Sequence, residues 1–448
     1  MVLYKTFIKH AESAVRGYPR LGLSWVSFVV ACWIWGTLPT VSWAQSGLEA
    51  FPKINAEKDW PWWRGVQRNG HSANALAPTS ISETENLDWS TPIPGRGHSS
   101  PIVVGDRIYL ITAEDSKQTH SAIALDRKSG SIVWSRVLNQ GGFPKKNHPK
   151  NTEASPTLAC DGERLYVSLF HHLSISAVAL SLDGEKLWEK KLGVYDPKMF
   201  EYGYAPSPVL YGDSVIFAFE YDGPSALIAL NRTDGNEKWR TTRKESITFS
   251  SPVVTSYMGV DYLLISGVGS VSAYDPATGQ QRWSTPGTTM ATCGTMVWDD
   301  GICFASGGFP KAETIAIDVM SGKVRWRNNQ KAYEQSMIAT GGHLYSLTDS
   351  GVLYCWEGKS GTEMWKQRLA GPVSASGVLV GDKIYWANEA GQLWVFQADP
   401  TKYIGISKNQ IGDEAFASPA ICGDQIFLRV AKSENGNRQE YLMRFSSR

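Results

Sequence analysis

Side chains that could bind a ligand or a metal ion stand in short loops, each close to an apolar run of residues. The candidates combine carboxylates, an amide, tyrosines and a histidine, namely His98, Asn151, Glu153, Tyr202, Tyr204, Glu334 and Glu414. Carboxylate and amide oxygens are ligands that Ca²⁺ accepts, and tyrosine rings can stack against a sugar. If the loops converge, these residues predict a binding site for such a cation or sugar. The alternative is that the loops hydrogen-bond to one another and only close a channel.

No arrangement of residues identifies a reaction. The sequence contains no nucleophile paired with a base, no phosphate-binding glycine loop and no Cys-x-x-Cys metal spacing. No catalytic residue and no metal ligand is therefore assigned. His98 and His148 could serve as a ligand or a base, but no spacing rule links them. A lone histidine in a loop is more often solvated or bonded locally.

The elements that must position these loops follow a repeat. Glycine followed four residues later by tryptophan occurs six times, at Gly130/Trp134, Gly184/Trp188, Gly235/Trp239, Gly279/Trp283, Gly322/Trp326 and Gly361/Trp365. In the first copy, Asp126 and Gly130 bracket a tight turn, because aspartate bonds the backbone ahead of it and glycine tolerates positive φ. The alternation of apolar and polar residues up to Trp134 is that of a half-buried strand. Each copy therefore predicts a strand, a turn and a second strand.

Each repeat unit opens with serine or a variant, followed by an apolar strand and in most units a Gly-Asp-type turn. Eight openings occur, at Ser100, Ser155, Ser207, Ser251, Gly294, Ser336, Ser376 and Ser418. Four short strands per unit are typical of a propeller blade. We therefore expect an all-β fold, an eight-bladed β-propeller of four-stranded blades over residues 89–448. The first strand of each blade would line a central channel, so that the loops entering these strands meet at one mouth.

The ring is expected to close through the N-terminal strand around Trp89. The eighth unit ends before any tryptophan strand, whereas residues 86–90 form a tryptophan strand with no unit of its own. Pairing these two parts closes the ring and leaves only short edges exposed. The tryptophans expected to dock between blades are Trp89, Trp134, Trp188, Trp239, Trp283, Trp326 and Trp365. In the seventh unit, Ser407 stands where tryptophan is expected.

Two segments precede the ring. Residues 1–45 place four basic residues before the uncharged run Leu21–Leu38, followed by small residues at Ser42 and Ala44. This layout predicts a cleaved secretory signal, a retained membrane anchor, or a lipoprotein signal with lipid on Cys32. Each alternative exports the rest of the chain to the periplasm or cell envelope, with membrane contact only through this segment. Residues 46–88 form a polar lead-in whose cluster Asp59–Gly65 is either a ligand-stacking patch or a packing segment.

Composition excludes some classes of function. The net charge of the 448 residues is +1, and no basic stripe or RNA-binding motif occurs, so we expect no nucleic-acid partner. Five cysteines follow Cys32, an odd number that leaves at least one free thiol in a monomer. We expect a monomeric propeller in which the cysteines behave as small apolar residues.

The unit Ala273–Trp283, with the pattern Ala-x-Asp-x-x-Thr-Gly-x-x-x-Trp, resembles the tryptophan-docking repeat of pyrroloquinoline quinone (PQQ) propellers. Ala124–Trp134 and Ala316–Trp326 match with serine for threonine. The resemblance covers residues 89–448 and is to the compact PQQ-like repeat proteins, BamB-like members of the quinoprotein alcohol dehydrogenase-like superfamily. It implies eight blades. Enzymes of that superfamily bind PQQ and calcium at the channel mouth beside an adjacent Cys-Cys disulfide, which this sequence lacks.

Three functions are compatible with these observations. The first is an exported, noncatalytic propeller that acts as a binding scaffold for a protein, peptide or glycan partner in the cell envelope. The second, implied by the resemblance, is a quinoprotein oxidoreductase of alcohols or sugars that depends on PQQ and calcium. The third is a carbohydrate-binding or hydrolytic propeller, for which hydrolysis requires two carboxylates facing each other across a pocket. Because a fold does not carry its function with it, we expect the first.

Overall fold

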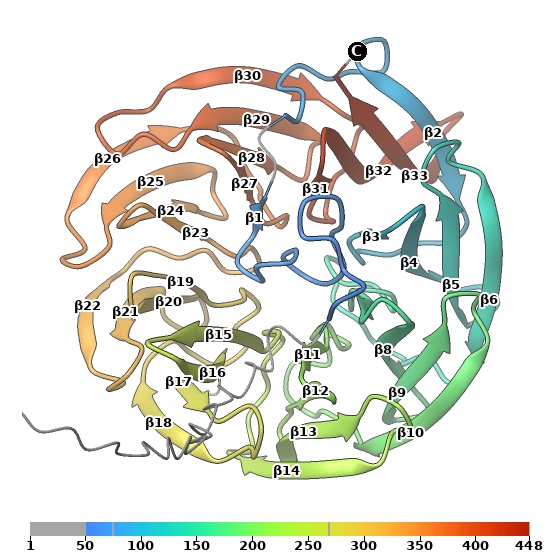
Figure 1. Ribbon diagram of the computed structural model, residues 1–448, viewed down its shortest axis with the longest axis horizontal. Helices are drawn as coiled ribbons and strands as arrows, with labels where there is room; N and C mark the ends of the chain where they lie inside the picture. The colour runs from blue at the N-terminus through green and yellow to red at the C-terminus, as the bar shows by residue number, and fades with distance from the viewer. Residues whose placement is uncertain (1–50, 74–75, 268, 448) are drawn as a thin grey trace, which may run out of the picture. The chain divides into compact units, whose positions relative to one another are not determined.

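The computed structural model describes residues 51–73, 76–267 and 269–447. The described residues all belong to one compact unit, Gln45–Arg448, and the predicted signal or anchor with Cys32 lies outside them. All the regular secondary structure of the described residues is β-strand, and the strands form a ring of eight blades (Figure 1). None of the described residues forms a helix suited to crossing a membrane.

Seven blades each use four consecutive strands, hydrogen-bonded in chain order from the centre of the ring outwards (Figure 1). The first two blades consist of β3 (Ile102–Val104), β4 (Arg107–Glu114), β5 (Thr119–Asp126) and β6 (Ile132–Gln140), then β7 (Ala159–Cys160), β8 (Arg164–His171), β9 (Ser174–Ser181) and β10 (Lys186–Val194). The next two consist of β11 (Val209–Tyr211), β12 (Ser214–Phe219), β13 (Ser225–Asn231) and β14 (Glu237–Arg243), then β15 (Val253–Tyr257), β16 (Val260–Gly267), β17 (Ser270–Tyr274) and β18 (Gln281–Pro286). Blades five and six consist of β19 (Val297–Asp299), β20 (Ile302–Gly307), β21 (Glu313–Asp318) and β22 (Val324–Asn328), then β23 (Ile338–Thr340), β24 (His343–Leu347), β25 (Val352–Glu357) and β26 (Glu363–Arg368). Blade seven consists of β27 (Val378–Val380), β28 (Lys383–Ala387), β29 (Gln392–Gln397) and β30 (Gly405–Gln410).

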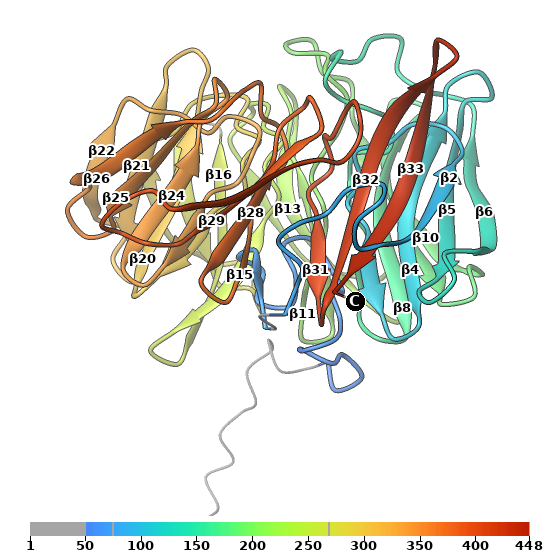
Figure 2. The same cartoon turned by 90° about the horizontal axis from the view of Figure 1, so that it is seen from above.

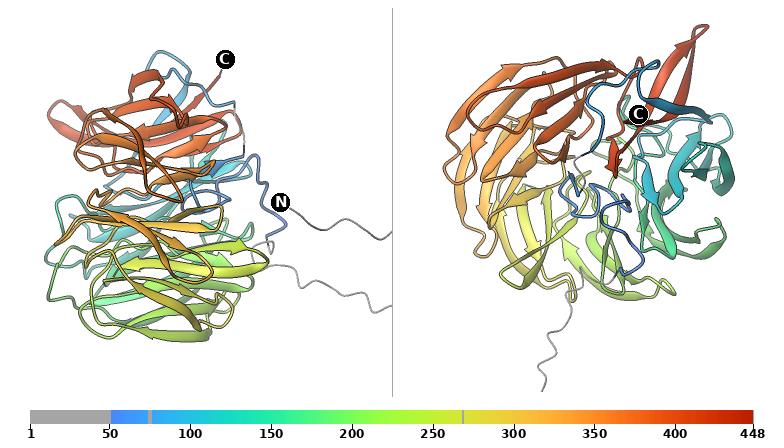
Figure 3. Two further views of the ribbon diagram at one scale, coloured as in Figure 1. Left: turned by 90° about the vertical axis from the view of Figure 1, so that its left-hand side faces the viewer. Right: turned by 45° about the horizontal axis from the view of Figure 1, so that its top comes forward.

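The eighth blade joins the two ends of the ring. Its inner strands are β31 (Ala420–Cys422), β32 (Gln425–Glu434) and β33 (Asn437–Ser446), and its outer strand is β2 (Leu87–Ile93). β2 pairs antiparallel with β33, with Trp89 opposite Arg444. The tip of the long β32–β33 hairpin projects from the ring (Figures 2 and 3). The predicted eight-bladed propeller, closed by the strand around Trp89, is therefore confirmed.

Tryptophans join each blade to the next. Trp283 on β18 is 9% exposed, while Arg282 and Ser284 beside it are exposed, and its indole Nε1 donates to the Val319 carbonyl of the next blade over 2.8 Å. Its ring lies against Gly322, where a Cβ atom would come within 2.8 Å of the indole and φ is +70°. Glycine is thus needed there both for the backbone conformation and for the space. The indoles of Trp89, Trp134, Trp188, Trp326 and Trp365 donate in the same way to the carbonyls of Arg127, Leu182, Arg232, Gly358 and Asp399.

The seventh blade lacks its tryptophan because the lead-in fills that position. Ser407 lies opposite Val395, the pairing that tryptophan makes with its partner in the other blades. The Ser407 hydroxyl donates to the Thr79 carbonyl, and Ile81, only 2% exposed, donates its N–H to Asn409 Oδ1 over 3.0 Å. The lead-in chain therefore packs between blades seven and eight.

An earlier part of the lead-in closes one end of the channel. We call residues 59–72 the plug; it includes β1 (His71–Ser72), which pairs parallel with β27. Figure 3 shows this segment across the centre of the ring. Arg64 is 2% exposed and donates to the carbonyls of Gly377 and Met337, which belong to different blades, over 2.6 and 2.9 Å. Burial lowers the pKa of Arg64 to about 9, so it is still a cation at neutral pH and strengthens both hydrogen bonds.

A circle of serine and threonine hydroxyls, interrupted at one joint, links the blades at the start of their innermost strands. We call it the hydroxyl girdle; it consists of Ser100, Thr157, Ser207, Ser251, Thr295, Ser336, Ser376 and Ser418, all buried. Seven backbone N–H groups each donate to the hydroxyl of the next blade over 2.8–3.1 Å, including the link from Ser418 N–H back to Ser100 Oγ; among the described residues, the joint between Ser251 and Thr295 has no such link. The Thr295 hydroxyl instead accepts from Trp63 Nε1 over 2.8 Å. The units that form blades two and five therefore begin at Thr157 and Thr295, and the expectation that they begin at Ser155 and Gly294 was wrong.

Candidate functional site

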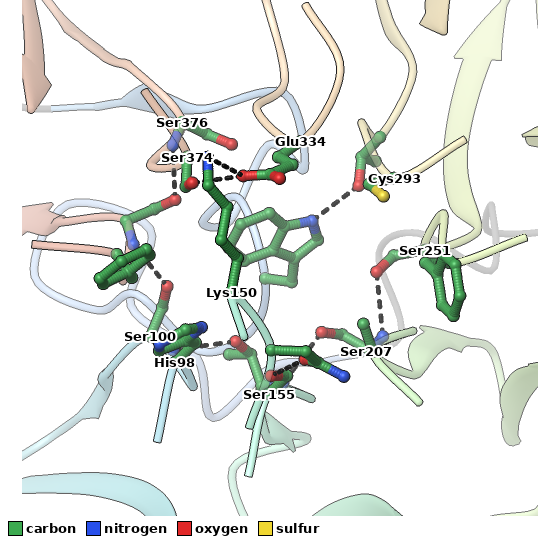
Figure 4. A pocket seen from close by; sticks show the side chains of 18 of the residues that line it. His98, Ser100, Lys150, Ser155, Ser207, Ser251, Cys293, Glu334, Ser374 and Ser376 are labelled. Carbon is green, nitrogen blue, oxygen red and sulfur yellow. Dashed lines mark hydrogen bonds and ion pairs between the residues drawn. The ribbon is translucent and has the colours of Figure 1, made fainter. Parts of the chain in front are cut away.

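A pocket of about 180 Å³ lies on the axis of the ring, at the mouth opposite the plug (Figure 4). Trp63 of the plug and seven girdle hydroxyl residues line it, so the plug and the girdle form its inner part. The loops ahead of the innermost strands supply the rest of the wall. The channel is therefore a blind pocket, because the plug closes the opposite end.

Aromatic rings form much of the wall. His98 stacks on Phe416 with 4.5 Å between ring centroids and 6° between planes. Tyr202 stacks on Phe249 at 6.3 Å and 27°, and His148 meets Tyr202 edge-on at 4.7 Å. Burial, together with nearby arginines, holds the pKa of His98 well below its usual value. His98 is therefore a neutral ring at physiological pH, and the wall is largely apolar and flat.

A lysine and two glutamates form the charged part of the site. Lys150 Nζ lies 2.6 Å from Glu389 Oε1 and 3.8 Å from Glu334 Oε2, and the Ser374 hydroxyl bonds to both carboxylates. Burial raises the pKa of Glu334, although Ser374 and Lys150 oppose this shift. Burial acts to lower the pKa of Lys150, but the hydrogen bond to Glu389 and the two negative charges raise it above its usual value. Lys150 is thus a fixed cation between two acidic side chains.

Four of the seven predicted site residues line this pocket. They are His98, Asn151, Tyr202 and Glu334, which come from loops entering four different blades. Both polar atoms of the Asn151 side chain already have protein partners. Its Nδ2 donates to the Tyr202 carbonyl over 2.6 Å, and its Oδ1 accepts from the Ser155 hydroxyl. It therefore holds the loop of Tyr202 in position.

The other three predicted residues lie outside the pocket. Tyr204 is 3% exposed, and its hydroxyl donates to the Ala218 carbonyl over 2.7 Å, so it belongs to the core. Glu414 turns outward and pairs with Arg438 at 2.7 Å. Glu153 lines a separate cavity beside the loop that follows β6, where its carboxylate accepts from Asn147 Nδ2 over 2.7 Å. The structure therefore does not place Glu153 and Tyr204 in the same pocket as Glu334, contrary to the expectation from the sequence.

Glu153 makes the stability of the protein depend on pH. Burial raises its pKa from 4.5 to about 7, despite the hydrogen bond from Asn147. The folded state therefore holds this proton more tightly than the unfolded state, and stability falls as pH rises from about 4.5 to 7. We expect Glu153→Gln to raise the free energy of unfolding at pH 8, by at most roughly 3 kcal/mol, and to have little effect at pH 4. Urea unfolding at both pH values measures this. Equal effects at the two values would contradict it.

Several residues of the site were not predicted from the sequence. Lys150 stands next to the predicted Asn151, but no pattern in the sequence distinguishes it. Trp63 is part of the cluster Asp59–Gly65, of which Trp60 and Trp62 are buried packing residues while Trp63 reaches the pocket. Glu389 follows β28 rather than preceding an innermost strand. Turns between the second and third strands of a blade also reach this mouth. Counting these turns among the candidate loops would have pointed to Glu389.

The residues at the mouth do not fit PQQ with calcium. Ca²⁺ takes six to eight oxygen ligands, usually with several carboxylates, but Glu334 is the one carboxylate that lines the pocket within the described ranges, and it faces Lys150. No cluster of three or more His, Cys, Asp or Glu side chains suited to a metal occurs among the residues that the structure describes. PQQ is a large tricarboxylate, whereas Lys150 is already paired and the volume is below the 300–1,000 Å³ of typical ligand pockets.

The fold and the repeat define the class of protein: a PQQ-like β-propeller. The sequence profile described as outer membrane protein assembly factor BamB matches residues 79–201, 147–335 and 310–402. The chain therefore belongs to the BamB family of PQQ-like propellers.

Individual proteins are similar at lower levels of identity. Outer membrane protein assembly factor BamB of Burkholderia pseudomallei (strain K96243) is 22% identical over 373 residues, which are 71% of this chain and 91% of that protein. The crystal structure of BamB from Moraxella catarrhalis has a TM-score of 0.58 at 14% identity, over 80% of this chain and 99% of that one. A europium-containing methanol dehydrogenase has a TM-score of 0.63 at 12% identity, over 87% and 98% of the two chains. At such identities, the structural likeness to BamB and to a dehydrogenase concerns the fold alone.

Proposed function

We propose that this protein is an exported, noncatalytic binding scaffold of the cell envelope that holds a partner at the open mouth of its ring. The observation that carries this proposal is the asymmetry of the channel. The plug closes one end, and the other end presents a pocket with aromatic walls and one charged cluster. Flat aromatic rings around a concave centre suit recognition of a partner. Membership of a family named for outer membrane protein assembly supports an envelope location and a protein partner.

The charged cluster supports binding rather than catalysis. Glu334 and Glu389 lie on the same side of the mouth, on neighbouring blades, and share Ser374 and Lys150. Glycoside hydrolysis needs two carboxylates that flank the bond to be broken, one of them near an open position for water or for attack. Two carboxylates bonded to the same serine and lysine do not have this arrangement. The proposal therefore assigns the cluster to shaping the mouth.

Site-specific photo-crosslinking tests the proposal. A benzophenone amino acid in place of Phe416, which lines the mouth, is expected to crosslink an envelope protein in living cells. The same amino acid in place of Met258 is the control, because Met258 is 77% exposed in the β15–β16 turn, on the plug side of the ring. A crosslink from Met258 and none from Phe416 would reject the mouth as the binding face. Recovery of the mature protein in the cytoplasmic fraction would reject export.

Titration with PQQ and Ca²⁺ tests the alternative function as a quinoprotein oxidoreductase. We expect no calcium-dependent binding of PQQ, because the pocket is small and Glu334, the one carboxylate that lines it among the described residues, faces Lys150. Calorimetry of the purified protein measures this directly, with dye-linked oxidation of alcohols and sugars as a second readout. Calcium-dependent PQQ binding at micromolar affinity or better would make the protein a quinoprotein and would overturn the scaffold proposal.

A further inference from the structure

We infer that the pocket binds one ring of an uncharged sugar, with its faces against the aromatic wall and its oxygens toward the hydroxyl girdle. This inference rests on the proposed function, because the pocket is the centre of the proposed binding mouth. It names a ligand class for that mouth. Three features of the pocket carry it: its hydrogen-bond donors, its charge, and the shape of its walls.

The girdle gives the pocket a wall of unused donors. Each of its hydroxyl oxygens already accepts one N–H, from a neighbouring blade or from Trp63. Within the described ranges, no protein acceptor is bonded to any of the eight hydroxyl hydrogens. Seven of these residues line the pocket, and all are 6% exposed or less. A ligand that fills the pocket must therefore bring hydrogen-bond acceptors, because buried O–H groups without partners are costly.

The charge of the site favours a neutral ligand. Lys150 is the one lysine or arginine that lines the pocket among the described residues, and Glu334 and Glu389 both lie within 4 Å of it. The cluster carries one negative charge in excess when both carboxylates are ionised. A carboxylate or phosphate group that entered the pocket would lose its hydration and face this excess negative charge, and Lys150 is already paired and cannot compensate it. A cation would meet the positive ends of the girdle O–H groups. Acceptors on an uncharged molecule avoid both costs.

The walls and the size indicate a single ring with apolar faces. The stacked pairs His98–Phe416 and Tyr202–Phe249 and the indole of Trp63 present flat surfaces around the axis. The C–H faces of a pyranose pack against such rings, and its hydroxyl groups can both accept and donate. Glu334 Oε1 has no protein partner in the part of the chain that the structure describes, and it can accept from a sugar hydroxyl. A volume of about 180 Å³ is below that of drug-sized ligand pockets and suits one ring.

Saturation-transfer NMR on the purified, full-length exported protein tests the inference. The neutral probes are methyl α-glucopyranoside, methyl α-mannopyranoside, methyl β-galactopyranoside and N-acetylglucosamine; the charged probes are acetate, phosphate and the dipeptide Gly-Phe. We expect saturation of at least one neutral probe, with a millimolar dissociation constant as is usual for a single ring, and none of the charged probes.

Variants locate the binding. Tyr202→Ala is expected to weaken binding about tenfold through loss of stacking, and Glu334→Gln several-fold. The matched controls are Tyr441→Ala and Glu185→Gln, which lie outside the pocket and are expected to leave binding unchanged. Circular dichroism of each variant verifies that the ring is folded.

Each other outcome overturns the inference. Saturation of acetate or phosphate alone would make the pocket an anion site, saturation of the zwitterion Gly-Phe alone would make it a peptide site, and saturation of no probe would leave it a water-filled channel end. Binding of a sugar that survives Tyr202→Ala would locate the sugar elsewhere. These results are independent of the crosslink from the Phe416 position, so that a protein partner at the rim can be retained while the sugar is rejected, and the reverse.

Discussion

Removal of residues 51–93 is expected to abolish cooperative folding of the ring. This segment contains the plug and β2, and it buries Trp60, Trp62, Ile81 and Ile93 at 4% exposure or less. Burial of each large apolar side chain contributes about 1.5–3 kcal/mol, and loss of Arg64 also leaves buried carbonyls without a donor. The free energy of unfolding of a domain is typically only about 5–15 kcal/mol, so the summed losses are comparable to the entire stability of the ring.

A shorter deletion separates the two parts of this segment. Removal of residues 51–73 takes away the plug but keeps β2 paired with β33. We expect this variant to fold with a lower melting temperature, whereas removal of 51–93 gives no melting transition by calorimetry. If the longer deletion melts at the temperature of the full-length protein, closure by β2 does not stabilise the ring.

Trp283→Ala is expected to lower the free energy of unfolding by about 3–5 kcal/mol, as for large aromatic side chains in cores. The substitution removes the contact with Gly322 and the hydrogen bond to the Val319 carbonyl. The cavity cannot refill, because the turn that carries Gly322 belongs to a neighbouring blade. Urea unfolding followed by circular dichroism measures the change.

Trp239→Ala is the matched control for this prediction. Trp239 also packs on the glycine of the next blade, Gly279, but its indole Nε1 has no hydrogen-bond partner among the described residues, and its side chain is less buried. We expect its loss to cost about 1 kcal/mol less than that of Trp283. A near-neutral effect of Trp283→Ala would show that docking of the indole contributes little to the joint between blades.

The blades could be predicted from the sequence because their signals are local. The spacing from Gly322 to Trp326 specifies a turn and the start of a strand within a few residues, and Trp89 without a unit of its own indicates closure. The plug has no such signal. Arg64 bonds to carbonyls 273 and 313 residues further along the chain, and no spacing within the lead-in indicates those partners.

The candidate site could be predicted only in part, because loop positions do not specify where side chains point. Tyr202 and Tyr204 are two residues apart, yet Tyr202 faces the pocket while the Ala218 carbonyl draws Tyr204 into the core. Arg438 on the β32–β33 hairpin holds Glu414 away from the axis. The loops ahead of the innermost strands line one mouth, as expected for a propeller, while the individual contacts depend on partners from distant strands.

The hydroxyl girdle also bears on how the ring comes apart. In an open array of repeats, unfolding can begin at a terminal repeat and proceed one unit at a time. The girdle joins the first and last blades, since Ser418 N–H reaches back across 318 residues to Ser100 Oγ, and its one interruption among the described residues lies between Ser251 and Thr295. Opening any blade except the fourth or fifth therefore disturbs hydroxyl links on both of its sides. Amide protons of the girdle links away from this interruption should exchange with solvent only when the whole ring opens, so that they share one common protection free energy.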